Sequence, residues 1–476
     1  MNTNKNLPVV VDLDGTLIFT DILYESLIKC LKTKFWVVLM LPFWLLKGKA
    51  YLKAKIANYV KIDVETLPYN RPLITWLKKE KKGGRKIFLS TASDRSVALK
   101  ISSHLNLFTD VFASDGVKNL TGKTKATFLC EHFGEKKFVY AGNENPDLYV
   151  WAKSYSGIVV SKSKRLIDKA KSLTKIDLIA PPQVTLKSWV KLLRVHQWVK
   201  NLLLFAPMLA AHQINQIGNW QTLILAFFSF SLCASCIYII NDLFDLESDR
   251  LNSYKANRAF ASGQISVIKG LMIAPILLLF SLLLGKYIND YFFTWIIIYF
   301  VVALSYSLIL KKFVIIDCLT LAILYTLRLL AGGAAIDVKL STWLLTFSIF
   351  LFLSLAFIKR YTELKELSSI NNKKAHGRGY LTSDTKLIKQ TGLILGYISV
   401  LVLALYLNSE TVIKLYKNPE FIWGAIPALL IWINWMWLQS HRGNMHQDPI
   451  LFAIKDKFSI TAGMIFTLSF ILAQFF

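Results

Sequence analysis

The sequence predicts an N-terminal α/β domain followed by an all-α polytopic membrane domain with about nine transmembrane helices. Up to about residue 180, short apolar runs alternate with helical, Lys-rich stretches, which is the pattern of an α/β domain. Beyond that point the apolar runs are long enough to cross a bilayer. The composition agrees, because 54% of the 476 residues are hydrophobic and the mean hydropathy is +0.44.

The formal charge of +26 indicates the kind of partner to expect. Basic residues interleaved with membrane spans are typical of cytoplasmic loops, so we expect a bilayer and phosphorylated substrates rather than nucleic acid. The five cysteines suggest no disulfide framework, and the pair Cys233 and Cys236 lies in an apolar run without a second pair for zinc. The polar N-terminus leads directly into a strand-like run, so no signal peptide is predicted.

One apolar segment of the N-terminal domain, residues 35–46, does not fit the α/β alternation. The predicted strands are the apolar runs 8–11, 86–89, 138–140 and 157–160. With about twelve residues, the segment 35–46 is too short to span a bilayer, and lysines flank it on both sides. It fits either a buried helix pair or an interfacial segment that touches the membrane, and the Trp and Lys residues at its ends favour the interfacial segment.

Residues 180–183, which include two prolines, mark the predicted boundary between domains 1–180 and 181–476. The predicted spans are 199–212, 220–240, 266–285, 291–310, 313–335, 341–358, 388–408, 420–438 and 458–476. Lys and Arg concentrate in the loops after the even-numbered spans, whereas the loop 213–219 has none. The positive-inside rule therefore places the α/β domain and these loops in the cytoplasm. We expect an integral protein of the bacterial inner membrane.

A predicted buried strand, residues 9–11, leads into Asp12, Asp14 and a Gly turn. α/β sheets place their ligand sites at the carboxyl ends of strands. At this position Asp12 can attack phosphorus as a nucleophile, and Asp14 can give a proton to the leaving oxygen. The stretch 8–165 resembles the haloacid dehalogenase (HAD) superfamily of phosphatases, for which Asp-x-Asp-Gly-Thr after an apolar strand is a specific signal.

The HAD resemblance implies a Rossmann-like sheet with a small helical cap and a phosphate site. By it, Thr91 would bind the phosphoryl group and Lys125 would neutralise it, although Lys123 is close enough to compete for that role. Asp12, Asp14, Asn143 and Asp147 would hold Mg²⁺. Asn143 stands where the family normally has an aspartate, which removes one negative charge. Weaker metal binding, a silenced phosphatase and an inert module that docks at the membrane all remain open.

A second cluster of acids follows the second predicted span. Asp242, Asp245 and Asp249 stand at i, i+3 and i+7, so they share one face if the helix continues. Such carboxylates repel one another and need a counter-charge. A divalent cation is the best candidate, because Mg²⁺ prefers a few carboxylates together with substrate phosphate oxygens. Basic residues follow, including Arg258, which favours a diphosphate site over a solvated helix cap.

With these surroundings, residues 185–476 resemble the UbiA superfamily of intramembrane prenyltransferases, and within it the branch of decaprenyl-phosphate phosphoribosyltransferases. The segments that carry the resemblance are 194–201 (Arg-Val-His-Gln-Trp-Val-Lys-Asn), 241–249 with Arg258, 306–311 (Tyr-Ser-Leu-Ile-Leu-Lys), Arg328 with 331–333 (Ala-Gly-Gly), 359–364 (Lys-Arg-Tyr-Thr-Glu-Leu) and 435–449. The aspartate motif is specific to the superfamily, and the last two segments narrow it to the phosphoribosyl branch.

The resemblance implies Mg²⁺-dependent transfer of a 5-phosphoribosyl group from phosphoribosyl pyrophosphate (PRPP) to a polyprenyl phosphate. The HAD half would then remove the 5′-phosphate, giving polyprenylphosphoryl ribose for cell-envelope glycan synthesis. Asp242 and Asp245 would be essential, and the metal ligands would be Asn241, Asp242, Asp245 and Asp249. The expected phosphate and substrate contacts are Lys200, Arg258, Tyr306, Lys311, Arg328, Lys359, Arg360 and Glu363.

Several alternatives remain at this point. A buried arginine in a span is costly without a partner or ligand, so Arg328 either binds substrate or pairs with Asp317 or Asp337. The other basic residues could be ordinary cytoplasmic loop charges. For the whole chain, the alternatives are an aromatic prenyltransferase that uses a polyprenyl diphosphate, and a transporter. The transporter is disfavoured, because the acids cluster at span ends and no internal repeat is found.

Overall fold

The computed structural model describes residues 7–178, 184–252, 255–369, 378–407, 409, 412, 415–445 and 448–475. The chain forms two compact units, and each is made of two stretches of sequence. The first is Met1–Leu192 with Ile239–Ile273, and the second is Leu193–Tyr238 with Ala274–Phe476. The segment with the three aspartates therefore belongs to the same unit as the α/β domain. The predicted boundary at 180–183 lies outside the described residues.

A six-stranded parallel sheet forms the centre of the first unit. Its strands are β1 (Val9–Val11), β2 (Ile87–Asp94), β3 (Asp110–Ser114), β4 (Val139–Gly142), β5 (Ser156–Val159) and β6 (Lys175–Leu178). They are ordered β3-β2-β1-β4-β5-β6, and Val9 pairs with Ile87 on one side and Val139 on the other. Because β1 is central, the residues that follow it lie at the middle of the carboxyl edge of the sheet.

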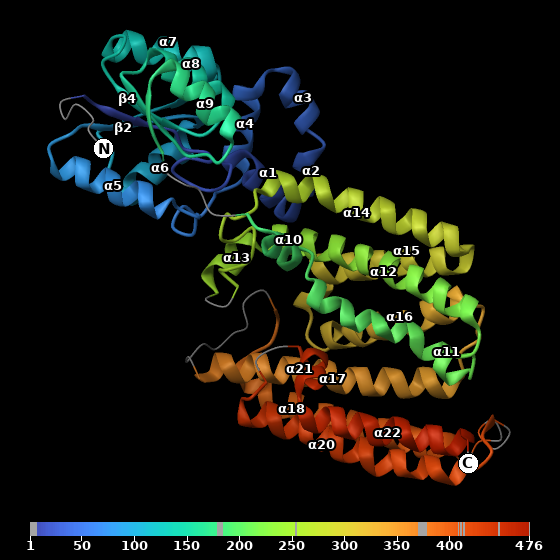
Figure 1. Cartoon of the computed structure of the whole chain (residues 1–476). Coiled ribbons are helices and arrows are strands. Elements are labelled where there is room, and N and C mark those ends of the chain that lie inside the picture. Colours follow the sequence, from blue (N-terminus) through green and yellow to red (C-terminus); the bar gives the residue numbers. More distant parts are fainter. Residues whose placement is uncertain are drawn as a thin grey trace. The chain divides into compact units, whose positions relative to one another are not determined.

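Successive residues of β1 point to opposite faces of the sheet, and each face has its own hydrophobic core. Val9 and Val11 pack in one core and Val10 in the other. Helices α1 (Ile22–Thr33), α4 (Lys49–Tyr59), α5 (Arg71–Lys82) and α6 (Arg95–Leu105) cover the first face, and α7 (Gly122–Phe133), α8 (Leu148–Lys153) and α9 (Lys164–Leu173) the second (Figure 1). The predicted α/β domain is confirmed.

The segment 35–46 forms two short helices, α2 (Phe35–Val38) and α3 (Leu41–Leu46), with Pro42 in the first turn of α3. Val37 is buried and Trp44 stacks on Tyr59, so the segment is anchored to the domain. Most of its other apolar side chains are exposed, and Leu46 reaches 87%. This exposure does not fit a buried helix pair.

Eight helices in the described part of the chain are long and apolar enough to cross a membrane. They are α12 (Ile217–Phe244), α14 (Val267–Ile288), α15 (Asp290–Leu308), α16 (Ile316–Ala335), α17 (Thr342–Ser369), α18 (Thr385–Leu407), α20 (Ala425–Arg442) and α22 (Lys457–Phe475). The shorter elements are α10 (Leu186–Leu192), η3 (Leu310–Lys312), η4 (Thr382–Asp384), η5 (Pro419–Gly424) and α21 (Pro449–Lys455). The predicted all-α membrane domain is confirmed.

The range 199–212, predicted as the first span, is not a long helix. It forms the 3₁₀ helix η2 (Val195–Phe205) and the short helix α11 (Ala206–Ala210). Pro207 has no backbone N–H to donate within a continuing helix. At Gly332 of α16, the backbone of Leu204 approaches so closely that a side chain would collide with it. The apolar character of 199–212 therefore reflects packing against α16, which the sequence alone does not distinguish from a span.

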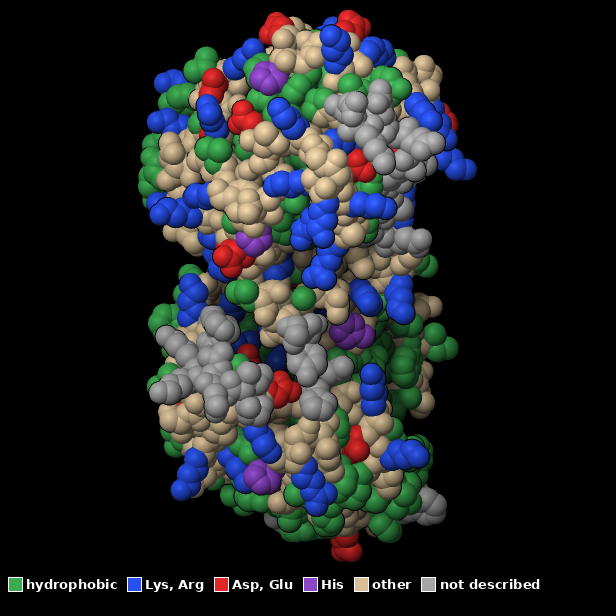
Figure 2. All heavy atoms as spheres, turned by 90° about the vertical axis from the view of Figure 1, so that its left-hand side faces the viewer, with side chains coloured by type: hydrophobic (Ala, Val, Ile, Leu, Met, Phe, Trp, Pro, Cys, Tyr) green, Lys and Arg blue, Asp and Glu red, His purple; other side chains and the backbone are tan. Residues whose placement is uncertain are grey.

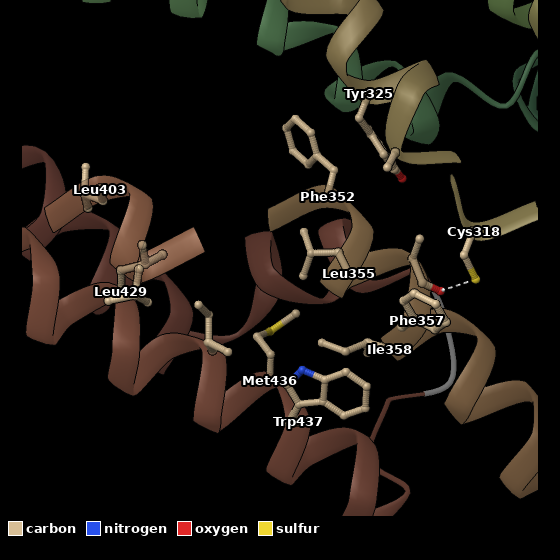
Figure 3. Close-up of a cluster of buried hydrophobic side chains, with 14 of the residues drawn as sticks. Cys318, Tyr325, Phe352, Leu355, Phe357, Ile358, Leu403, Leu429, Met436 and Trp437 are labelled. Carbon is tan, nitrogen blue, oxygen red and sulfur yellow. Dashed lines mark hydrogen bonds between the residues drawn. The ribbon is translucent and has the colours of Figure 1, made fainter. Parts of the chain in front are cut away.

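A large apolar core joins α16, α17, α18 and α20. Figure 3 shows residues of this cluster: Phe352 lies on the same side of α17 as Tyr325, with which its ring packs, and Met436 and Trp437 of α20 lie on the other side. Cys318 Sγ donates to the Ala356 carbonyl, so even this thiol is satisfied within the core. On the face of the chain seen in Figure 2, Lys and Arg side chains are widespread, whereas Asp and Glu are sparse.

Candidate functional site

The carboxyl edge of the sheet brings together the residues predicted for the phosphate site of the first unit. Lys125 Nζ lies 2.6 Å from Asp12 Oδ1, and both residues are buried. Asp14 accepts from the Ser93 hydroxyl at 2.6 Å and from the Ile22 amide at 2.9 Å. Burial raises the pKa of both aspartates to about 7, with Lys125 opposing the rise at Asp12.

Lys125, rather than Lys123, approaches the aspartates because of its position on α7. Lys125 is buried, whereas the ammonium of Lys123 lies over the exposed ring of Tyr149. Thr91 is fully buried on β2, two residues beyond Leu89, which pairs with Val11 of β1. Its hydroxyl accepts from the Ser93 amide. Lys125 of α7 and Thr91 of β2 thus lie at the carboxyl edge of the sheet, where Asp12 and Asp14 also lie.

In the loop after β4, the carboxylate of Asp147 accepts hydrogen bonds from the protein instead of facing an open metal position. Asp147 accepts from the Tyr140 hydroxyl at 2.6 Å and from the amides of Asn143 and Glu144 at 2.9 and 3.0 Å. The Asn143 side-chain oxygen accepts from the Thr16 hydroxyl at 3.1 Å. The described residues contain no group of three or more His, Cys, Asp or Glu that could hold a metal. Because Asp147 is engaged by these three donors and Asn143 carries no charge, a carboxylate-rich Mg²⁺ site does not fit this half, and we derive no step through a metal there.

The aspartate-rich segment is broken rather than continuous. Helix α12 ends at Phe244, and a second helix, α13 (Leu246–Leu251), begins directly after Asp245. The condition under which the three aspartates would share one helical face, a helix that continues through residue 249, is therefore not met. Asp242 and Asp249 nevertheless converge, because Arg258 Nη1 lies 3.0 Å from the first and 2.7 Å from the second.

Each acid of this segment has a cation beside it. Arg258 forms salt bridges with Asp242 and Asp249, and the ammonium of Lys32 lies 3.5 Å from Asp245 Oδ1. Burial raises the pKa of Asp249, and Arg258 opposes that rise. Two converging carboxylates fit Mg²⁺ bound jointly with substrate phosphate oxygens, although the described residues offer no all-protein cage. Asn241 directly precedes Asp242 and is half-buried.

The second unit holds a separate cationic cluster. Asp448 accepts from Lys200 at 2.5 Å and from Lys359 at 3.1 Å. Arg328 donates to the Asn201 side chain at 2.9 Å and to the Tyr299 hydroxyl at 3.1 Å. The ring of Tyr325 lies 5.5 Å from both Lys200 and Arg328. No carboxylate pairs with Arg328 in the described part of the chain, so the alternative partners Asp317 and Asp337 are not used.

Arg360 has a different setting from its neighbour Lys359. It is fully buried and pairs with Asp317 at 2.7 Å and with Glu363. Arg378 pairs with both of these acids. Tyr306 of α15 and Lys311 of η3 are partly exposed. Among the predicted contacts, the structure thus groups Lys200 and Lys359 around one acid, and places Arg360 and Glu363 in a buried ion-pair network.

The sequence profile of the UbiA prenyltransferase family matches residues 202–462, which is more than half of the chain. The chain belongs to the UbiA prenyltransferase family. This UbiA chain is 33% identical to the uncharacterized protein y4nM of Sinorhizobium fredii over 99% of its own length and 92% of that protein.

Two further comparisons place this UbiA chain among its relatives. The decaprenyl-phosphate phosphoribosyltransferase of Mycolicibacterium smegmatis is 33% identical over 39% of this chain and 59% of that protein. A solved UbiA homologue from Archaeoglobus fulgidus, bound to DMAPP and Mg²⁺, is similar with a TM-score of 0.47 and 18% identity, over 60% of this chain and 99% of that one. Membership of the UbiA family, together with the eight apolar helices of the described residues, makes the chain an integral membrane transferase of the prenyltransferase type.

Several residues at these sites of the UbiA chain escape sequence reasoning. The Tyr140 hydroxyl lies between Lys125, at 3.0 Å, and Asp147. Asp448 belongs to the segment 435–449 that carries the UbiA resemblance, but the sequence predicts no role for it. Lys32 lies more than 200 residues before the acid that it contacts. The only available signal was for Asp448, because an acid beside Pro449 at the start of a short helix is a common cap.

Proposed function

We propose that this protein transfers a 5-phosphoribosyl group from PRPP to a polyprenyl phosphate and releases pyrophosphate. The observation that carries the proposal is the composition of the cluster in the second unit. Three cations, Lys200, Arg328 and Lys359, stand there against one carboxylate, Asp448. Such an excess of positive charge suits anionic groups on both substrates, namely the 5-phosphate of the donor and the phosphate of the lipid.

The reaction exchanges one oxygen for another at ribose C1. The bond between C1 and the diphosphate oxygen breaks, and an oxygen of the lipid phosphate forms the new bond. A magnesium ion held by Asp242, Asp249 and the neighbouring Asp245 would supply positive charge against the departing diphosphate. The attacking phosphate oxygen is already anionic at neutral pH, so the chain needs no general base. Lys200, Arg328 and Lys359 orient the anions.

We extend the proposal to the α/β half, which resembles HAD phosphatases. In this step Asp12 attacks the phosphorus of the 5′-phosphate, and the bond to the ribose oxygen breaks as Asp14 donates a proton to it. A pKa of about 7 suits Asp14 for this role, because a substantial protonated fraction exists at neutral pH. This first step releases polyprenylphosphoryl ribose, and water then hydrolyses the aspartyl phosphate, which regenerates Asp12 and gives inorganic phosphate. Lys125 compensates the negative charge.

We also propose that the α/β half works at the cytoplasmic face of a bacterial inner membrane, with residues 35–46 touching the bilayer. The exposed apolar side chains of α2 and α3, flanked by lysines, support this arrangement.

The experiment that tests the proposed function uses membranes containing the full chain, Mg²⁺, labelled PRPP and a long-chain polyprenyl phosphate. Lipid products are separated before and after phosphomonoesterase treatment. A labelled lipid that the treatment leaves unchanged supports both steps, and one that it shifts supports transfer alone. If PRPP labels no lipid while a polyprenyl diphosphate is consumed with an aromatic acceptor, the proposal fails in favour of an aromatic prenyltransferase.

A further inference from the structure

Helix α1 of the α/β half carries three charged residues that face the aspartate-rich segment. Glu25, Lys29 and Lys32 stand at i, i+4 and i+7, so they share one face of the helix. Each has a partner of opposite charge in that segment, all within the first unit. The pairs are Glu25 with Arg250, Lys29 with Glu247, and Lys32 with Asp245.

The first of these pairs, Glu25 with Arg250, is a buried ion pair that fixes the position of α13 against α1. Arg250 donates to both oxygens of Glu25, at 3.0 and 2.5 Å, and the two side chains are only 5% and 3% exposed. The Thr20 hydroxyl donates to Glu25, and Arg250 donates to the Ala261 carbonyl. A buried pair with two parallel hydrogen bonds and further partners has a single geometry. Helix α13 is therefore held at one position against α1.

Lys32 acts at the point where α12 ends. Its ammonium donates to the carbonyl of Phe244 at 2.6 Å and lies 3.5 Å from Asp245 Oδ1. The last carbonyls of a helix have no partner within the helix, so this lysine satisfies one of them and adds a positive charge beside an acid. Lys32 and Arg258 together supply the counter-charge that three neighbouring carboxylates require.

The other end of α1 meets the phosphate site of the α/β half. The amide of Ile22, the first residue of the helix, donates to Asp14 Oδ1 at 2.9 Å. One helix of three turns thus begins at the aspartates of one candidate site and ends at the aspartates of the other.

We propose that α1 positions the aspartate-rich segment and that Lys32 is a residue of the diphosphate site, supplied to the transferase by the α/β half. With a metal–diphosphate complex bound, Asp245 would be a ligand of the metal and the ammonium of Lys32 would pair with the diphosphate oxygens. The inference rests on the proposed function only in that a diphosphate binds at these aspartates. It does not depend on which group the diphosphate carries.

The test measures binding in the full chain reconstituted in nanodiscs, with Mn²⁺ followed by electron paramagnetic resonance and labelled inorganic pyrophosphate as the ligand. Lys32→Gln removes the charge beside Asp245. We expect Mn²⁺ alone to bind about threefold more tightly, and pyrophosphate in the presence of Mn²⁺ about three- to fivefold more weakly, since the pair is partly exposed. A merely structural role would weaken both ligands together.

Two variants serve as controls. Lys34→Gln removes a neighbouring lysine whose ammonium lies over the ring of Tyr59, so both affinities should stay at the wild-type values. Lys32→Arg keeps the charge and should restore binding of pyrophosphate. The inference is overturned if Lys32→Gln behaves like Lys34→Gln, or if both affinities fall in parallel. If Lys32→Gln raises the affinity for Mn²⁺ and lowers that for pyrophosphate, but the wild type transfers no ribosyl group from PRPP, the inference about Lys32 holds and PRPP is excluded as the donor.

Discussion

Lys200 and Asp448 lie 248 positions apart in the chain, and their side chains meet at 2.5 Å with both almost completely buried. Lys359 joins the same carboxylate. Burial alone would raise the pKa of Asp448, but the two lysines lower it well below its usual value of 3.8. The charged carboxylate therefore stabilises the native state fully at pH values above 3.8, the ordinary pKa that applies to the unfolded chain. This stabilisation is lost as the pH falls from there through the lowered pKa of the native state.

Asp448→Asn should lower the free energy of unfolding by about 3 kcal/mol at pH 7, because it leaves two lysines without their acid. The difference between wild type and variant should shrink as the pH falls below about 4, where the Asp448 carboxylate of the unfolded chain takes up a proton while the native carboxylate is still charged. Thermal unfolding in nanodiscs between pH 3 and 7 measures this difference. A difference that does not depend on pH would contradict the assignment of a charged Asp448.

Asp242→Asn should reduce ribosyl transfer by about 10²- to 10³-fold, because it removes one of the two carboxylates that converge on Arg258. Labelled PRPP and polyprenyl phosphate provide the assay. The matched control is Asp290→Asn, which removes an exposed acid that pairs with Lys286 on the neighbouring helix and should leave transfer intact. Near-normal transfer by the Asp242 variant would exclude these aspartates as the diphosphate site.

Asp12→Asn should leave the transfer step unchanged and cause the 5′-phosphorylated lipid to accumulate. The reason is that the buried Asp12 beside Lys125 is the proposed nucleophile of the second step alone. Chromatography before and after phosphomonoesterase treatment distinguishes the two lipids. If the wild type and the variant yield the same phosphorylated lipid, the α/β half has no phosphatase activity, and positioning of the aspartate-rich segment is its remaining role.

Leu46→Cys, labelled with an environment-sensitive fluorophore, should report contact with lipid. Leu46 is 87% exposed at the end of α3, so brominated lipids should quench the probe by at least about half in nanodiscs if the segment lies in the headgroup region. Val117 is 92% exposed in a loop of the same domain and provides the control position. Equal quenching at the two positions would argue against a bilayer-facing segment.

The sequence was most informative where a local period or a compact motif carries the fold. The apolar run of Val9, Val10 and Val11 predicts a buried strand, and the acids directly after it predict a site at the carboxyl edge of the sheet. The sequence led to a wrong prediction at 199–212, where a membrane span was expected. An apolar run that packs against α16 at Gly332 has the same composition as a run that faces lipid. The sequence also did not predict the contact between Lys32 and Asp245, because no sequence pattern connects two side chains that only tertiary packing brings together.

The first unit is assembled from two stretches of chain that are made at different times. Protein synthesis adds roughly 5–20 residues per second, so Arg250, which lies 225 positions after Glu25, is made about 10 to 45 s later. During that interval Glu25, Lys29 and Lys32 exist without their partners, while the residues in between enter the membrane. The unit that contains the α/β domain therefore acquires its complete structure only after α12 has been made, which links its maturation to the membrane in time.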